Sequence, residues 1–372
     1  MALATYFHQV EKIGGAERMV CNLASHLSKA RGICHLITWD KLDSNPCNEL
    51  EESVQFSPLG SRRGLFGKPT RVWRLAQYLR DNKIRTLIGF VMSGDKAVYM
   101  AAKISGVNLV VAERNAPAMY DIKYGWWQRK MSFNMMRFAD RITVQMPAYR
   151  DVYPQYLRER IRVIPNPVLV PSSFAEPAKS NNGYFSLLYH GRLDLFQKQL
   201  DILLQAFALV SKEFSNWNLV IMGDGEGRDD LNLLSSQLGI TGKFQLMPAR
   251  ESPLEVISKA HLYAMPSRWE GFPNSLAEAM AMGLPAVGYR NCSGVADLIE
   301  EGRSGWLADG NGNIESLANE LSAAMRNGDE RQNRGLAARD AMRKYKLSEQ
   351  LKKWEDVLDL SLIHISEPTR PY

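Results

Sequence analysis

The chain has 372 residues, of which 45% are hydrophobic and 23% charged, enough for two cores and hence two domains of about 170 residues each. It has no apolar run of the roughly 20 residues that span a bilayer, and no basic-then-apolar leader, so we expect a cytoplasmic protein. The four cysteines lie far apart, with no Cys-x-x-Cys pair and no His at metal-ligand spacing, so the sequence suggests neither a disulfide framework nor a zinc site.

Charge is divided unevenly along the chain. Residues 1–170 hold 25 Lys and Arg against 14 Asp and Glu, whereas the remainder holds 21 against 26. The basic amino-terminal half indicates an anionic partner, either nucleic acid or an anionic membrane surface.

The first predicted strand, Leu3–Val10, leads to a glycine pair, Gly14 and Gly15. These glycines allow positive φ and close approach of the main chain to a ligand. Apolar residues at helical spacing then predict a helix over Ala16–Ala30, which would begin at the glycines. A glycine pair after a strand is by itself more often a tight turn than a phosphate-binding loop.

Short apolar runs alternating with helical periodicity predict a parallel sheet covered on both faces. The predicted strands are Cys34–Trp39, Leu87–Met92, Leu109–Ala112 and Ile142–Gln145, and the clearest helices are Arg71–Asn82 and Gly94–Ser105. Glu113, Arg114 and Asn115 follow the end of one strand, where Glu113 and Arg114 could form a salt bridge.

Two stretches suggest a membrane-facing surface. Residues 62–68 form a basic loop with an apolar centre, and Tyr120–Phe138 interleaves aromatic residues with Lys and Arg, a pattern that suits the lipid headgroup layer. The alternative is a helix that packs its aromatic face into the core and keeps its cations outside.

The first domain ends with Ile161–Val168, whose two prolines precede a polar linker at Pro171–Gly183. The second domain begins with a strand at Tyr184–Tyr189, followed by a loop and a helix over Gln199–Glu213. That loop carries two cations, Arg192 and Lys198, which can converge on a diphosphate or remain solvated.

The next strand, Asn218–Met222, precedes Gly223-Asp-Gly-Glu-Gly227, which imitates a dinucleotide fingerprint. We reject that interpretation because its acidic residues would repel a pyrophosphate, and we read the glycines as a turn into a helix over Arg228–Leu238. A strand at Phe244–Met247 then leads to a loop that ends at Arg250.

A buried strand at Ala260–Pro266 precedes a loop that carries Glu270. Ser275 and Glu278 have the spacing of a capping box, so a helix should start at Ser275, with Glu278 in its first turn. Ligands bind at this edge of open α/β sheets, and helix amino ends attract phosphate. The plainer interpretation is that Glu278 only caps the helix and Glu270 is a solvated charge.

The carboxyl-terminal part continues with a strand and four helices. The strand is expected within Pro285–Tyr289 and the helices at Val295–Glu301, Ile314–Arg326, Arg331–Tyr345 and Leu347–Asp359, the last returning to the first domain. Residues 360–372 resemble a translated sequencing adapter, so we exclude this tail from the fold and expect the natural carboxyl terminus to be missing.

Six motifs together resemble glycosyltransferase family 4, a retaining family with the α/β fold called GT-B. The first is the pair Glu270 and Glu278, which are separated by seven residues. The others are Gly14–Arg18, Glu113–Asn115, Ile164–Val168, His190–Arg192 with Lys198, and Gly223–Gly225. The resemblance implies two Rossmann-like domains facing a cleft, with the acceptor side at 1–170 plus 347–359 and the donor side at 171–346.

The resemblance also implies the site. Arg192 and Lys198 would bind the departing diphosphate and Glu270 the sugar hydroxyls. The donor-binding set would be Gly14, Gly15, Met247, Arg250, Phe272, Pro273, Asn274, Ser275 and Glu278. Glu113, Arg114 and Asn115 would contact sugar or acceptor, although relatives carry a His in this neighbourhood. Gln199 replaces the glycine that commonly follows the lysine.

The implied reaction transfers a hexose or N-acetylhexosamine from a nucleoside-diphosphate sugar, with UDP favoured over GDP, to a glycan or polyprenyl-diphosphate-linked glycan. No cofactor is expected, and no metal, because the chain lacks Asp-x-Asp. Nucleic acid is not an expected partner, whereas peripheral attachment to an anionic membrane is left open. The alternatives are a GT-B epimerase acting on a nucleotide sugar and a non-catalytic module that binds nucleotides or nucleic acid.

Overall fold

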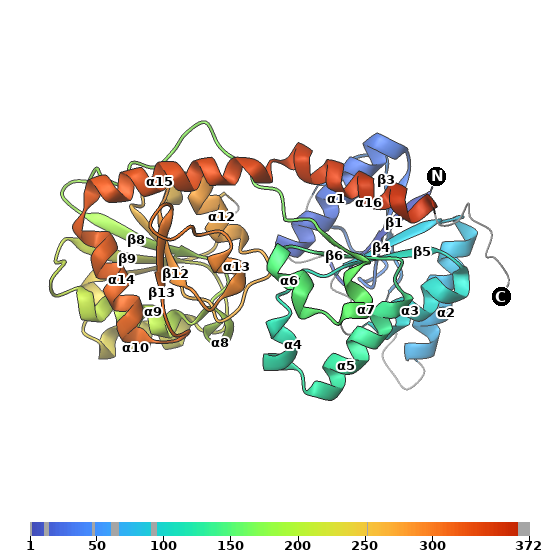
Figure 1. Cartoon of the computed structure of the whole chain (residues 1–372), viewed down its shortest axis with the longest axis horizontal. Coiled ribbons are helices and arrows are strands. Elements are labelled where there is room, and N and C mark those ends of the chain that lie inside the picture. The colour runs from blue at the N-terminus through green and yellow to red at the C-terminus, as the bar shows by residue number, and fades with distance from the viewer. Residues whose placement is uncertain are drawn as a thin grey trace. The chain divides into compact units, whose positions relative to one another are not determined.

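The chain forms two compact units in the computed structural model, which describes residues 2–10, 15–46, 49–60, 67–90, 95–250 and 252–363 (Figure 1). The first unit runs to Asn166 and takes up the chain again at Ser348, and the second is Pro167–Leu347. The boundaries predicted from the sequence, after residues 170 and 346, are close to where the described chain divides.

A seven-stranded parallel sheet forms the centre of the first unit, in the order β3-β2-β1-β4-β5-β6-β7. Its strands are β1 Leu3–Tyr6, β2 Cys34–Thr38, β3 Val54–Pro58, β4 Thr86–Phe90, β5 Asn108–Ala112, β6 Arg141–Val144 and β7 Ile161–Val163. The central strands β1, β2 and β4 are buried at every residue, as expected of parallel strands covered on both faces. Two edge strands, β3 and β7, were not predicted, since β3 is only partly buried and lacks a continuous apolar run.

The helices of this unit connect successive strands. They are α1 Gly15–Arg31, α2 Gly67–Asp81, α3 Lys96–Ser105, α4 Ala118–Lys123, α5 Trp126–Met135, α6 Pro147–Val152, α7 Gln155–Arg158 and the carboxyl-terminal α16 Leu347–Ile363, with a short 3₁₀ helix η1 Met136–Phe138. The predicted helix starting at the glycines agrees with α1, whereas Gly14 lies outside the described residues. The backbone of α16 continues helically to Ile363, beyond the predicted end at Asp359.

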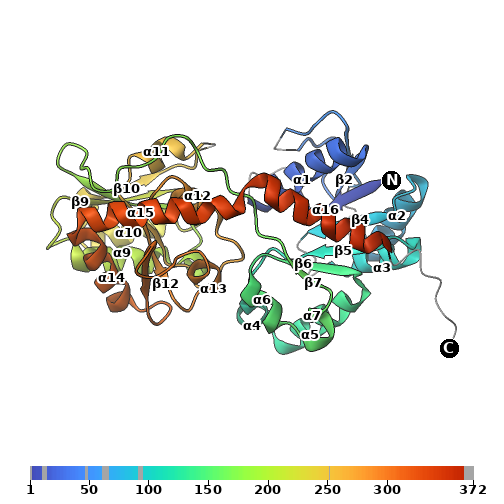
Figure 2. The same cartoon turned by 45° about the horizontal axis from the view of Figure 1, so that its top comes forward.

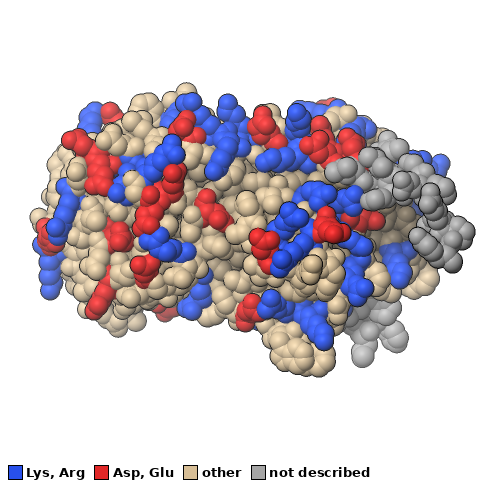
Figure 3. Space-filling view, in the orientation of Figure 1, with Lys and Arg blue, Asp and Glu red and all other residues tan. Residues whose placement is uncertain are grey.

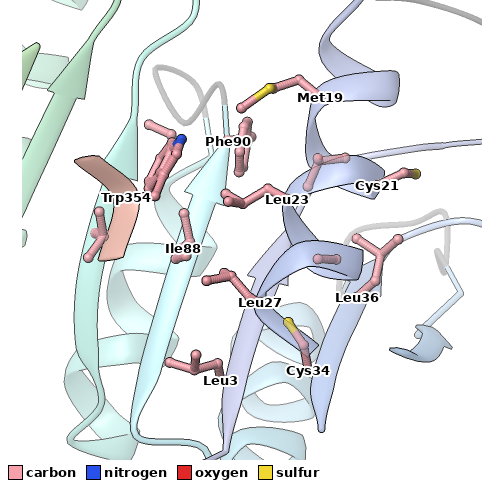
Figure 4. Close-up of a cluster of buried hydrophobic side chains, with 14 of the residues drawn as sticks. Leu3, Met19, Cys21, Leu23, Leu27, Cys34, Leu36, Ile88, Phe90 and Trp354 are labelled. Atoms are coloured by element: carbon pink, nitrogen blue, oxygen red, sulfur yellow. The ribbon is translucent and has the colours of Figure 1, made fainter. Parts of the chain in front are cut away.

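Helix α16 completes the core of the first unit. Trp354 is fully buried and stacks on Phe90 with ring centroids 6.0 Å apart, among side chains from α1, β1 and β2 (Figure 4). Figures 1 and 2 both show α16 lying over the strands of this unit. Burial of the tryptophan ring therefore ties the end of the chain to its beginning.

A six-stranded parallel sheet, in the order β10-β9-β8-β11-β12-β13, forms the second unit. Its strands are β8 Phe185–His190, β9 Trp217–Met222, β10 Phe244–Met247, β11 Leu262–Met265, β12 Ala286–Tyr289 and β13 Gly305–Ala308. Its helices are α8 Leu195–Lys198, α9 Leu200–Val210, α10 Arg228–Gln237, α11 Leu254–Ser258, α12 Asn274–Ala281, α13 Ser293–Ala296, α14 Ile314–Arg326 and α15 Gly328–Met342, with 3₁₀ helices η2 Thr241–Lys243 and η3 Arg343–Tyr345. Strand β13 was not predicted from the sequence.

Both sheets place the loops that follow their strands at one edge. In the second unit, β8, β11 and β12 are consecutive neighbours, so the loops after His190, Met265 and Tyr289 leave the same edge side by side. Ligands of open parallel sheets bind at this kind of edge. The predicted donor-binding residues of the second domain gather there.

Candidate functional site

A buried ion pair lies at the carboxyl edge of the second sheet. Lys198, the last residue of α8, places its Nζ 2.5 Å from Oε1 of Glu270 in the loop after β11. Only 11% and 7% of these side chains are exposed. Removing charges from water is costly, and a buried pair persists only where surrounding contacts fix both partners. The fold therefore holds together two of the three residues predicted to act in catalysis.

The turn after Lys198 depends on a left-handed residue. Gln199 has φ 50° and ψ 45°, and its N–H donates to the carbonyl of Leu195, which closes the short helix α8 before α9 begins. Glycine adopts this conformation without steric cost, which explains why the resembling family commonly has one here. Gln199 thus adopts the left-handed turn that a glycine would adopt without steric cost.

Arg192 is exposed and lies on the same pair of loops. Its Nη2 donates to Oε1 of Gln197 at 3.0 Å, and the Gln197 Nε2 donates to the carbonyl of Trp269 at 3.1 Å. The amide of Arg268 donates to the Gln197 carbonyl at 2.8 Å. Gln197, which the sequence analysis did not single out, thus links Arg192 to the loop that carries Glu270.

The predicted capping box at Ser275 is wrong. Helix α12 starts at Asn274 with Pro273 at its N-cap and no side-chain cap, which places Glu278 beyond the first turn. Ser275 instead hydrogen-bonds the buried hydroxyl of Tyr263. Ser275 thus makes a tertiary contact with β11 in place of a local cap, and the Tyr263 hydroxyl also donates to the carbonyl of His190 at 3.1 Å.

Glu278 meets His190 at the end of β8. The His190 Nε2 lies 3.2 Å from the Glu278 Oε2, and the imidazole is packed edge-on against Tyr263 with centroids 5.4 Å apart. The Glu278 side chain keeps 25% of its surface exposed. A fixed, partly exposed carboxylate at this edge can accept hydrogen bonds from ligand hydroxyls.

The remaining predicted donor-binding residues of the second unit differ in burial. Phe272 is buried with its ring edge-on to Tyr345, Pro273 is buried, and Asn274 is half-buried. Met247 is half-buried and its carbonyl accepts from the amide of Gly223, whereas Arg250 is exposed.

The rejected dinucleotide fingerprint has a structural purpose. A Cβ on Gly223 would lie 1.8 Å from the carbonyl oxygen of Gly191, and a Cβ on Gly225 would lie 2.9 Å from the backbone of Leu193. These glycines let the loop after β9 pack against the loop after β8, the one that leads to Arg192 and Lys198. They support the candidate site through packing.

In the first unit, Arg114 is committed to internal contacts. Its guanidinium lies over the rings of Phe90 and Trp354 and donates to the carbonyl of Ile164 at 3.1 Å. Burial lowers the pKa of Arg114 to about 9, with the Glu113 carboxylate acting in the opposite direction. The Tyr120 hydroxyl donates to Glu113 at 2.8 Å.

Two other predicted residues lie in the described part of the first unit. Asn115 is half-buried, and Gly15 begins α1. A sugar contact by Arg114 would require its guanidinium to leave the internal partners, so Asn115 is the more accessible of the three predicted contacts.

Cys292 is a site neighbour that the sequence analysis missed. It follows β12, its thiol contacts the backbone of Glu270, and burial together with the Glu270 carboxylate raises its pKa to about 12. Its position after a neighbouring parallel strand was the available signal. Cys21 and Cys34 are also free and buried, and Cys47 lies outside the described residues.

Groups that could hold a metal, with three or more His, Cys, Asp or Glu together, are absent from the residues that the structure describes. The described part of the chain also contains no helix that is both long and apolar enough to cross a membrane.

Two family models match successive parts of the chain. Residues 13–169 match the model described as Glycosyltransferase Family 4, and residues 173–341 match the one described as Glycosyl transferases group 1. The two matches divide the chain near the boundary between the units.

Curated relatives cover most of the chain at low identity. An uncharacterized glycosyltransferase of Haemophilus influenzae is 26% identical over 87% of this chain and 90% of its own length. A Campylobacter jejuni α-1,4-N-acetyl-D-galactosaminyltransferase, named for an undecaprenol-diphosphate-linked glycan, is 25% identical over 79% of this chain and 81% of its own.

Among solved structures, Anabaena HepE in complex with UDP and glucose superposes with a TM-score of 0.77 at 16% identity, over 96% of this chain and 99% of that one. At this identity the likeness shows a shared fold.

Proposed function

Because this chain belongs to the family 4 glycosyltransferases with the GT-B fold, we propose that it transfers a hexose or N-acetylhexosamine from a UDP-sugar, with retention at the anomeric carbon. The acceptor is a glycan or a polyprenyl-diphosphate-linked glycan of a bacterial surface polymer. The naming of the Campylobacter relative for such an acceptor, and the UDP and glucose in the Anabaena structure, support these choices.

The contact between Lys198 and Glu270 is the observation that carries the proposal. A nucleotide sugar has an anionic diphosphate and a polyhydroxylated ring joined at the anomeric carbon. A cation for the phosphate and a carboxylate for the hydroxyls must therefore lie next to each other, as these two groups do at 2.5 Å. In the buried setting, the ammonium stabilises the charge that develops on the leaving phosphate.

The other residues have supporting roles in this proposal. Arg192, held by Gln197, adds a second cation to the diphosphate, and Glu278, held by His190, accepts from the ribose hydroxyls. We propose that the leaving phosphate takes the acceptor proton and that the acceptor attacks on the same face of the sugar. With two cations on the phosphate, no divalent metal is required, and turnover should persist with a chelator.

The donor is tested by incubating the protein with a panel of UDP- and GDP-sugars, with and without undecaprenyl-diphosphate-linked glycans, and following the products by mass spectrometry. We expect transfer, or slow hydrolysis, from one or a few UDP-sugars, and an α-linked product by NMR if the donor is α-linked. An epimer formed from the donor alone would indicate the isomerase alternative, and no nucleotide binding by calorimetry would contradict the proposal.

Lys198→Ala and Glu270→Ala should each lower turnover by about two or more orders of magnitude, the usual scale for one transition-state contact. Because removing one partner leaves a buried charge, each single variant should also lose roughly 3 kcal/mol or more of stability, and the double variant less. Steady-state rates are therefore compared at a temperature where thermal unfolding shows all variants folded.

The matched control is Lys259→Ala, which breaks a 2.8 Å pair with Glu255 in the same unit where both side chains are 67% exposed. We expect no change in turnover and a stability change below about 1 kcal/mol. Near-wild-type turnover in both folded site variants would rule out this assignment of the site.

A further inference from the structure

Two tryptophans project from the first unit at the start of α5. Trp126 and Trp127 are 64% and 66% exposed, and their rings stack with centroids 4.3 Å apart. Three more apolar side chains on the same segment are also exposed: Ile122, Met131 and Phe138. We call residues 122–138 with these exposed side chains the tryptophan surface. An exposed apolar surface of this kind marks an interaction site.

The segment that presents these rings is firmly packed from beneath. Phe133 and Tyr120 are buried with ring centroids 5.1 Å apart, and Phe133 also packs on Tyr153 at 5.2 Å. The aromatic stretch noted in the sequence is thus divided between core and exterior. The exposure of the tryptophans belongs to a fixed surface and does not result from a loosely attached helix.

Positive charge accompanies the tryptophan surface. Residues 118–138 contain four Lys and Arg and one acidic residue, Asp121, which pairs with Arg129 at 2.5 Å. Lys123, Lys130 and Arg137 are exposed around the rings. Figure 3 shows uncharged atoms projecting at the lower edge of the molecule, where α4 and α5 lie, with Lys and Arg beside them.

We propose that the tryptophan surface docks on an anionic lipid bilayer. Indole rings prefer the headgroup layer, where the apolar ring face leaves water while the N–H keeps a polar partner. Flanking lysines and arginines are attracted by the anionic headgroups, and this attraction adds to the insertion of the rings. The one acidic side chain of residues 118–138, Asp121, would be repelled by anionic headgroups, but it is already paired with Arg129. A surface with apolar centre and cationic surroundings complements an anionic membrane in both respects.

The test is flotation of the full-length protein with phosphatidylcholine vesicles, with and without anionic phosphatidylglycerol, at low and high salt. We expect the protein to float with anionic vesicles and to be released by salt. The Trp126→Ser/Trp127→Ser variant should bind vesicles at least about tenfold more weakly than the wild type. The Lys123→Gln/Lys130→Gln variant should lose about tenfold or more of its affinity for anionic vesicles and none of its affinity for phosphatidylcholine vesicles.

The matched control is Trp73→Ser on α2, because Trp73 is 63% exposed in the same unit but lies outside the tryptophan surface. It should bind vesicles as the wild type does. Lipids brominated in their acyl chains should quench the tryptophan fluorescence of the wild type and of Trp73→Ser. The quenching should be weaker in the double tryptophan variant.

Three results would overturn the proposal. They are failure of the wild type to bind anionic vesicles, equal binding by the double tryptophan variant, and a loss of binding in Trp73→Ser that matches the loss in the double variant. Self-association in sedimentation velocity that only the double tryptophan variant abolishes, without lipid binding, would assign the surface to a second copy of the chain instead. Vesicle binding requires no nucleotide sugar, so this outcome is independent of the proposed reaction.

Discussion

At the scale of single residues, His261 shows how burial fixes a protonation state. Its Nδ1 accepts from the amide of Ser186 at 2.9 Å, and its Nε2 donates to the carbonyl of Lys179 at 2.9 Å. Only the neutral imidazole can make both bonds, since a second proton on Nδ1 would face an N–H donor. Burial, with a smaller contribution from the Arg331 charge, lowers the pKa of His261 to about 4.

This lowered pKa predicts a pH-dependent stability. The unfolded chain binds the proton below about pH 6.5, whereas the folded state resists it until about pH 4, so the contribution is complete above 6.5 and is lost as pH falls toward 4. We expect the wild type to lose about 2 kcal/mol more than His261→Gln over this window. Urea unfolding at several pH values checks this, and parallel pH profiles for the two proteins would contradict it.

At the scale of elements, the candidate site depends on the contact between two loops. The connection after β8 carries Arg192 in its loop and Lys198 at the end of α8, and the amide of Leu193 donates to the carbonyl of Asp224 in the loop after β9. The contact is close only because Gly223 has no side chain. The site cations are therefore positioned by a neighbouring strand connection as well as by their own helix.

Gly223→Ala should consequently destabilise the second unit by about 3 kcal/mol or more, because its Cβ would overlap the Gly191 carbonyl oxygen. The matched control is Gly242→Ala, where an added Cβ meets nothing within 4 Å, and we expect a change within about 0.5 kcal/mol. Chemical denaturation of both variants measures the difference. Equal stabilities would show that the loops do not pack as described.

At the scale of the whole molecule, the first unit is assembled from both ends of the chain. Helix α16 supplies Leu351, Trp354, Val357 and Leu358 to a core otherwise built from residues before position 165. The Nη2 of Arg31 on α1 also lies 2.7 Å from Asp359. The first unit can therefore reach its final stability only after the end of the chain has been made.

Trp354→Ala should cost about 3–5 kcal/mol, because it removes a fully buried ring from beneath Phe90 and Arg114. Hydrogen exchange should accelerate in β4 and β5 of the first unit and remain unchanged in β11 and β12 of the second. Leu336→Ala serves as control, since Leu336 is 51% exposed on α15. Equal acceleration in both units would contradict this division of stability.

The sequence by itself determined the local elements and the fold class. Apolar runs alternating with helical periodicity predicted most strands of two parallel sheets, because burial on both faces requires such runs. It did not predict β3, whose partly buried residues alternate irregularly, nor β7 or β13. The spacing of Glu270 and Glu278, together with Arg192 and Lys198, placed the candidate residues correctly at one sheet edge because loops after parallel strands share that edge.

Only the tertiary structure decided which of these groups touch. The pairing of Lys198 with Glu270 and of His190 with Glu278, and the failure of the Ser275 capping box, arise between strands distant in sequence. The division of the aromatic segment into buried Phe133 and exposed Trp126 was decided in the same way. Such outcomes depend on which buried polar or apolar group has a partner across the sheet, and spacing along the chain does not contain that information.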